Sequence, residues 1–211
     1  GQGVPLRTTV VATPRPRSGT ATACETAIAR RMRRAHSRSK VTLVPGTPAR
    51  LLIDWPSGTT NVRNTTNAKG LPNAHWRPWL GPANRCLVPF TSFAEPDQDH
   101  EGTRQNIWFA FDQDRPLAFF AGIWTPHACV RKISRGWEEI EAFGFLTTES
   151  AEPVRTYHSK AMPVILTTEE ERDLWLSGAP WEEVRQLQRP LPPGALTIVA
   201  RGVKKDEAVL A

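Results

Sequence analysis

Apolar residues recur along most of the chain in short runs separated by polar turns, and this pattern predicts strands. Asn106–Asp112 (NIWFAFD) alternates, whereas Leu117–Trp124 (LAFFAGIW) is continuously apolar; Asp112–Pro116 between them is typical of a turn. The same criteria predict further strands at Arg85–Phe90, Ala142–Thr147, Met162–Leu166 and Ala195–Arg201.

Short helices are expected between these strands. Ala74–Leu80 favours a single helical turn, and a second helical segment is expected near Ala151–Tyr157. Thr168 and Glu171 have capping-box spacing at the start of a helix over 169–176, and Pro180 begins another that ends at Leu187. Strands mixed with short helices, without βαβ spacing, predict an α+β fold around a mostly antiparallel sheet.

The first part of the chain has a different composition. Residues 1–60 contain no Phe or Tyr and carry ten basic against two acidic residues, a balance of +8. Residues 61–211 carry 17 basic and 19 acidic residues, a balance of −2, so the net charge of +6 arises entirely in the first segment. We therefore divide the chain into a basic segment, residues 1–58, which is either disordered or the product of a shifted reading frame, and a folded domain, residues 59–211.

Several functional classes find no support in the sequence. No apolar run is long enough to span a membrane, and no signal peptide is recognisable. Cys24, Cys86 and Cys129 are widely spaced, which argues against a disulfide framework and for a reducing compartment. The cysteines and histidines lack metal-ligand spacing, so neither a metal nor a cofactor is expected. Cys86 lies in the predicted strand Arg85–Phe90 and is interpreted as a buried, inert thiol.

Three polar positions interrupt the apolar pattern. Glu95 follows a mostly apolar stretch, where a carboxylate is costly unless it is paired or functional. His158 precedes the apolar strand that begins at Met162, and Asn61 and Arg63 alternate around Val62. Each could equally be structural: an edge glutamate, a surface histidine, a turn asparagine. A carboxylate, an imidazole and an amide that converged in a cleft would suit acid–base chemistry, but spacing alone does not show convergence.

Five short motifs follow one another in order and carry a resemblance to a known family. They are Asn61–Thr66 (NVRNTT), Arg85–Glu95 (RCLVPFTSFAE), Ala121–Trp124 (AGIW), Leu146–Glu149 (LTTE) and His158–Leu166 (HSKAMPVIL). The series closely resembles the SOS response-associated peptidase (SRAP) family over about residues 59–203. The resemblance implies a curved, barrel-like β core with short flanking helices, and a basic groove for single-stranded DNA with abasic sites.

In that family, a cysteine exposed by self-removal of the initiator methionine condenses with the abasic-site aldehyde and forms a stable thiazolidine crosslink. By resemblance, Asn61 positions the cysteine and sugar, Glu95 is the general acid/base, and His158 assists proton transfer. Imine formation needs a proton donor for the departing water, and a partly buried carboxyl group suits that role. The residues expected to contact DNA are Arg63, Arg85, Lys160 and, by base stacking, Trp76 or Trp79, although a core role for either tryptophan is as well supported.

The sequence departs from the family at its start. Position 1 is glycine, and Cys24 would need cleavage after Ala23 to expose an amine. Pro96 follows Glu95 where the family usually has tryptophan. The polypeptide is therefore expected to be impaired in crosslinking. Two alternatives stay open, a non-catalytic single-stranded-DNA-binding module and an unrelated α+β interaction domain with a basic arm. A cytoplasmic, nucleoid-associated monomer is the default expectation.

Overall fold

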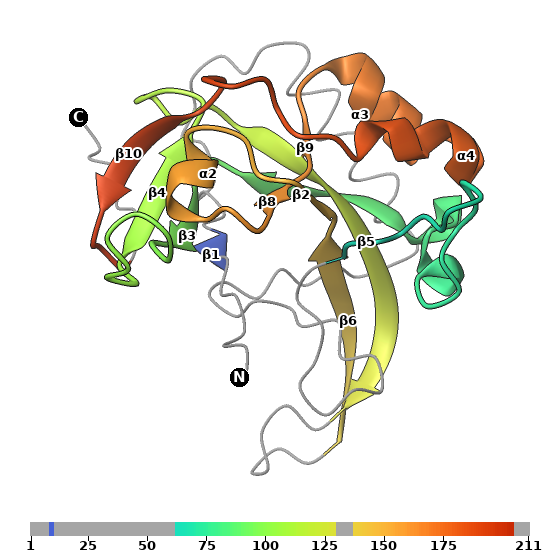
Figure 1. Cartoon of the computed structure of the whole chain (residues 1–211). Coiled ribbons are helices and arrows are strands. Elements are labelled where there is room, and N and C mark those ends of the chain that lie inside the picture. The colour runs from blue at the N-terminus through green and yellow to red at the C-terminus, as the bar shows by residue number, and fades with distance from the viewer. Residues whose placement is uncertain (1–8, 11–61, 130–136, 205–211) are drawn as a thin grey trace, which may run out of the picture.

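The computed structural model describes residues 9–10, 62–129 and 137–204, and these residues form an α+β fold with mostly antiparallel sheets and few short helices (Figure 1). The predicted fold class is confirmed. The described strands form open sheets, so the barrel-like closure stays a prediction.

The first sheet has four antiparallel strands in the order β1-β3-β4-β10. They are β1 (Thr9–Val10), β3 (Phe93–Pro96), β4 (Asn106–Ala110) and β10 (Thr197–Arg201). β1 lies within the basic segment and pairs with β3. Residues 11–61 lie outside the described part of the chain, so the division at residues 58 and 59 stays a prediction.

The second sheet is built around a long, bent hairpin of β5 (Ala118–Cys129) and β6 (Glu138–Phe145) (Figure 1). β2 (Arg85–Phe90) pairs with the other edge of β5, whereas β9 (Ile165–Leu166) pairs with β5 on the same edge as β6, beyond the end of β6. A separate pair joins β7 (Thr147–Thr148) to β8 (Met162–Pro163).

The chain crosses from one sheet to the other at Thr91–Ser92, between β2 and β3. One apolar cluster contains residues of both sheets, including Phe90 and Phe120, whose rings stack with centroids 3.9 Å apart, and Phe93 and Phe109, which are register partners. This cluster forms the core between the two sheets.

A second apolar cluster covers the other face of the β2-β5-β6 sheet. Because side chains alternate along a strand, Phe120 enters the first cluster whereas Ala121 and Ile123 enter the second. The second cluster also takes residues from α3 (Glu169–Leu176), α4 (Trp181–Val184) and the 3-10 turn η4 (Arg185–Leu187). The sheet is therefore buried on both faces around Ala118–Ile123, which explains the continuously apolar sequence of this first half of β5.

The remaining helical elements are short. They are the 3-10 turns η1 (Arg77–Trp79) and η2 (Pro82–Asn84), and α2 (Val154–Tyr157). α3 begins as predicted, because the Thr168 hydroxyl accepts the Glu171 N–H at 3.2 Å. None of the helices in the described residues is long and apolar enough to cross a membrane.

Candidate functional site

Four of the family-like motifs, which are far apart in the sequence, meet in one backbone junction. The Leu146 N–H donates to the Ala121 carbonyl at 2.9 Å, the Ala121 N–H to Val164 at 3.0 Å, and the Val164 N–H to Leu146 at 2.8 Å. Val62 joins by a parallel bridge to Leu146 and by accepting the Thr147 N–H at 3.0 Å. All four residues are buried in the second cluster. We call Val62, Ala121, Leu146 and Val164 the four-segment junction.

His158 lies directly after α2, on the segment that enters this junction. Its N–H caps α2 by donating to the Val154 carbonyl at 2.8 Å, and the residue is 0% exposed. Among the residues that the structure describes, neither ring nitrogen of His158 has a hydrogen-bond partner. A buried imidazole is normally hydrogen-bonded, so these unoccupied donor and acceptor positions identify His158 as a functional candidate.

The pKa of His158 is lowered, so its ring is neutral at pH 7. Burial lowers its pKa from the ordinary value, the Asp99 carboxylate opposes that shift, and the Lys160 ammonium adds to it. A neutral imidazole offers one N–H donor and one nitrogen acceptor. The ring can therefore accept a proton or donate a hydrogen bond to a ligand that reaches it.

Glu95 lies in β3 and is 4% exposed. Its register partner is Ile107, and it shares a sheet face with Phe93, whose side chain packs in the core between the sheets. α2, which ends just before His158, contacts β3. The structure thus places Glu95 on the strand that packs against the helix leading to His158.

Arg63 and Lys160 are brought together. The Arg63 guanidinium donates from Nη1 to the Lys160 carbonyl, so the segment after Val62 is fixed to the segment after His158. The Lys160 side chain is exposed and Arg63 is half-buried. Two cationic side chains consequently lie beside the His158 segment.

The Arg85 side chain is buried and binds the backbone of other segments. It is 5% exposed, and its guanidinium donates to the Leu80 carbonyl at 3.1 Å and to the Ala179 carbonyl at 2.8 Å. The same group lies 5.4 Å from the centroid of the Trp175 ring. Arg85 thereby connects β2 to the helical layer, and its burial leaves little of the guanidinium for a DNA phosphate.

The two candidate stacking residues differ in exposure. Trp76 is buried, and its indole N–H donates to the Arg63 carbonyl at 2.7 Å. Trp79 is half-buried and packs edge-on to Trp76, with centroids 6.5 Å apart. Trp76 therefore has the core environment that was the alternative to stacking, while Trp79 keeps an accessible part.

Asn61 lies outside the described residues. Cys86 is a free, half-buried thiol, and burial raises its pKa to about 12. The protonated thiol is a poor nucleophile, as expected for a structural cysteine. Within the described ranges, no cluster of three or more His, Cys, Asp or Glu residues could hold a metal ion.

Sequence reasoning missed the polar side chains that hold the first motif in place. The buried Thr65 hydroxyl bonds the side-chain amide oxygen of Gln188, whose NH2 group donates to the Thr147 carbonyl at 2.9 Å. The Trp181 indole donates to the Thr66 hydroxyl at 3.1 Å. The repeated threonines in this motif were the available signal.

The loop between β3 and β4 was also missed, although it contacts the residues on both sides of His158. The Gln98 N–H donates to the Tyr157 carbonyl at 2.9 Å, and the Asp99 carboxylate accepts the Ser159 N–H at 2.7 Å. The dense run of Asp, His, Glu, Gly and Thr over residues 97–103 is typical of turn chemistry, but it names no tertiary partner.

A family model described as SOS response associated peptidase (SRAP) matches residues 15–206. The match begins well before residue 59, where the motif-based resemblance starts. A solved structure, that of a protein from Bacteroides thetaiotaomicron, is 27% identical with a TM-score of 0.46 and covers 58% of this chain and 50% of that one. The chain thus spans about half the length of that protein. No curated protein matches the chain.

Proposed function

Because the chain belongs to the SOS response associated peptidase (SRAP) family, we propose that it binds single-stranded DNA containing abasic sites and acts on the ring-opened sugar. Membership associates the chain with the SOS response and DNA damage, and implies an interaction with DNA. The observation that supports the finer proposal is the buried, neutral His158 ring, whose two nitrogens have no partner among the described residues. A ligand that hydrogen-bonds this ring would break no hydrogen bond between the ring and the described residues.

Glu95 and His158 take the acid–base roles in this proposal. An amine of the protein adds to the aldehyde carbon of the open sugar and gives a carbinolamine. The carbinolamine oxygen then leaves as water, and an imine between protein and DNA results. Each step moves a proton, and a buried carboxyl group can donate the one that the leaving water needs. His158, neutral at rest, accepts a proton at its unprotonated ring nitrogen. Asn61 keeps its proposed role in positioning the sugar.

The proposed DNA contacts are Arg63, Lys160 and the accessible part of Trp79. Cationic side chains bind the phosphate backbone without reading sequence, and an aromatic face stacks on any base. Arg85 and Trp76 are left out of this surface, because the former binds two backbone carbonyls and the latter is buried against Arg63.

A lasting thiazolidine would require a second nucleophile beside the imine, and Cys86 does not suit that role. Its thiol is protonated at neutral pH, and Cys86 packs against the core between the two sheets. The stable family adduct needs a cysteine at an exposed amino terminus. We therefore propose that Cys86 takes no part in the adduct, and that an adduct formed without such a cysteine stays a reversible imine.

Binding is tested with a fluorescent oligonucleotide, either intact or carrying one abasic site. Anisotropy titrations at several salt concentrations measure affinity and its salt slope. Lys160→Ala should weaken binding and lower the slope by about 0.7, since one phosphate contact is lost. Lys69→Ala, an exposed lysine outside the proposed surface, is the matched control.

Chemistry is tested by borohydride reduction, which converts an imine into a permanent bond visible on a denaturing gel. His158→Ala should reduce the trapped product by about 10²-fold or more, in line with the loss of a general acid–base group. Binding without any trapped product would favour the non-catalytic DNA-binding module. Absence of binding to both oligonucleotides would contradict the proposal and favour the interaction domain.

A further inference from the structure

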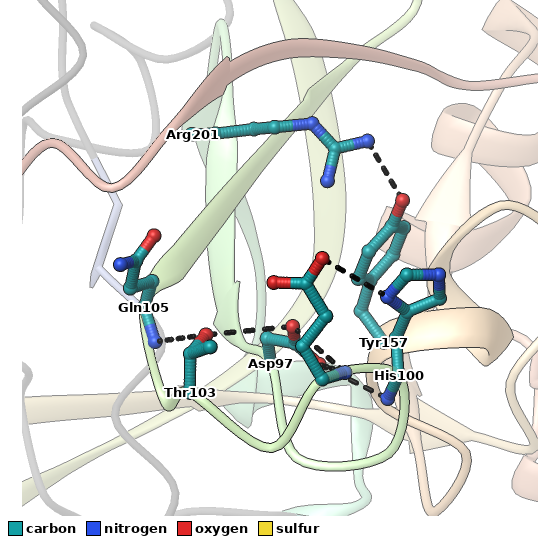
Figure 2. A network of polar contacts seen from close by, with 7 residues as sticks. Asp97, His100, Thr103, Gln105, Tyr157 and Arg201 are labelled. Carbon is teal, nitrogen blue, oxygen red and sulfur yellow. Dashed lines mark hydrogen bonds and ion pairs between the residues drawn. The ribbon is translucent and has the colours of Figure 1, made fainter.

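The loop between β3 and β4 is organised by one buried carboxylate. Asp97 is 2% exposed, and its Oδ1 accepts the N–H groups of His100 at 3.1 Å and Glu101 at 3.3 Å (Figure 2). Its backbone pairs with the far end of the loop, since its N–H donates to the Gln105 carbonyl at 2.8 Å and its carbonyl accepts the Arg104 N–H at 2.9 Å. These hydrogen bonds thus fix the conformation of the loop, which begins two residues after Glu95.

This loop is attached to the backbone on both sides of His158. The N–H groups of Gln98 and Asp99 both donate to the Tyr157 carbonyl, at 2.9 and 3.3 Å. On the other side, Asp99 Oδ2 accepts the Ser159 N–H at 2.7 Å. Asp99 is therefore the residue that contacts the chain both before and after His158.

Tyr157 is itself held from a third direction. Arg201 of β10 donates to its hydroxyl at 2.7 Å and lies 4.9 Å from the ring centroid, and the His100 ring packs at 5.3 Å (Figure 2). Tyr157, before His158, is consequently held by contacts of its side chain. Ser159, after His158, is held by the hydrogen bond of its N–H to the Asp99 carboxylate.

We propose that Asp99 is a positioning residue for His158: it fixes the backbone that carries the ring and supplies the negative charge that stabilises the ring when it accepts a proton. The inference rests on the proposed role of His158 in abasic-site chemistry. Asp99 transfers no proton itself; the proton moves between the ligand and a ring nitrogen, and Asp99 stays ionised throughout.

Charges around the site support this assignment. The Ser159 hydrogen bonds are the main reason that the pKa of Asp99 lies below its ordinary value, so its carboxylate is charged at neutral pH. Asp99 favours protonated His158, while burial and Lys160 oppose it. The other charged groups on segments that contact this region include Glu95 on β3, Asp97 and Glu101 on the loop, Arg155 on α2, Arg201 on β10, and Arg63, whose guanidinium binds the Lys160 carbonyl. Removing the Asp99 charge takes away the influence that raises the pKa of His158 and leaves burial and Lys160, which both lower it.

Two variants separate a charge effect from a merely structural one. Asp99→Asn retains a side-chain oxygen that can accept the Ser159 N–H but removes the charge, whereas Asp99→Ala removes both. Asp112→Asn is the matched control, because Asp112 is an exposed turn carboxylate that accepts a backbone N–H, from Asp114, at 2.8 Å. It lies in the turn between β4 and β5 and does not act on His158.

The experiment is an NMR titration of the histidine rings in the full chain without DNA, with His158 assigned by comparison with His158→Ala. We expect the His158 titration to shift to lower pH in Asp99→Asn and to be unchanged in Asp112→Asn. Identical His158 titrations in wild type and Asp99→Asn, including a ring that stays neutral in both, would overturn the proposal.

The borohydride assay then separates this inference from the proposed function. If His158→Ala traps as much product as wild type, His158 is not part of the chemistry and both fail. If His158→Ala loses trapping while Asp99→Asn and Asp99→Ala retain it at every pH, only the Asp99 role fails. The Asp99 role is supported if the fall in trapped product at acidic pH moves to lower pH in Asp99→Asn. Asp99→Ala must also give less trapped product than wild type.

Discussion

Gly122, in the middle of β5, is a position where one methyl group should be measurably destabilising. Cys86 is its register partner on β2. A Cβ at residue 122 would lie 2.7 Å from Val88 Cγ2 and 2.8 Å from Cys86 Sγ, and 3.2 Å from the Cys86 carbonyl oxygen. Apolar contacts are normally about 3.5–4.0 Å. The neighbours would have to retreat by roughly 0.8 Å or more.

The neighbouring side chains and backbone on β2 have little room to move away from an added Cβ. Val88 is buried and β-branched, so its rotamer choice is narrow. The Trp175 indole N–H is shared between the Cys86 carbonyl at 3.0 Å and the Gly122 carbonyl at 3.2 Å, so separating β2 from β5 also strains that bond. We expect Gly122→Ala to lower the free energy of unfolding by about 2 kcal/mol, within the usual 1–3 kcal/mol for overpacking.

The assay is urea unfolding followed by tryptophan fluorescence, with a thermal scan as a second measure. A loss of about 2 kcal/mol corresponds to a fall in Tm of roughly 4–8 °C for a chain of this size. Gly81→Ala is the matched control, because nothing lies within 4 Å of its added Cβ and its φ of −69° is ordinary. Val88→Ala should be less harmful in the Gly122→Ala background than alone. Equal stability of Gly122→Ala and Gly81→Ala would refute the reasoning.

Three further predictions concern caps, a buried indole and pH. Thr168→Ala should cost about 1 kcal/mol in urea unfolding, because the Glu171 N–H loses its cap, while Thr168→Ser should stay near wild type; equal losses in both would contradict the capping role. Trp76→Phe should also cost about 1 kcal/mol, since the Arg63 carbonyl loses its 2.7 Å hydrogen bond; unchanged thermal stability would count against it. Burial lowers the pKa of His158 in the folded state, so the unfolded chain binds more protons as pH falls below about 6.5, and stability should decline there. Urea midpoints at about pH 7.5 and about pH 5.5 measure this decline, which His158→Asn should reduce.

Much of the fold could be predicted because local patterns agree with tertiary packing. β2 and α3 have the predicted bounds, and the Thr168–Glu171 cap forms, with the Glu171 carboxylate also reaching back to accept the Thr167 N–H. The β5-β6 hairpin is longer than the apolar pattern indicated. Its arms continue to Cys129 and from Glu138, because backbone pairing continues between strands with polar side chains.

The residue types of the candidate site could be named from the sequence, but their arrangement in space could not. The motifs contain Glu95 and His158, yet nothing local shows that the β3–β4 loop binds Tyr157 and Ser159, since those contacts join residues about 60 positions apart. Arg85 illustrates the opposite case. A cation beside DNA and a cation that binds backbone carbonyls in the interior look the same in sequence, and burial alone distinguishes them.

The four-segment junction has a consequence for the order in which the molecule forms. Val62, Ala121, Leu146 and Val164 span about half of the sequence, so their pairings close long loops and are entropically expensive until most of the chain is compact. The β5-β6 hairpin and α3 can form locally and early. The His158 segment gains its fixed position only when these distant stretches pair, so a partly folded chain would hold its secondary structure without a working site. The proposed chemistry should therefore become possible only when folding is complete.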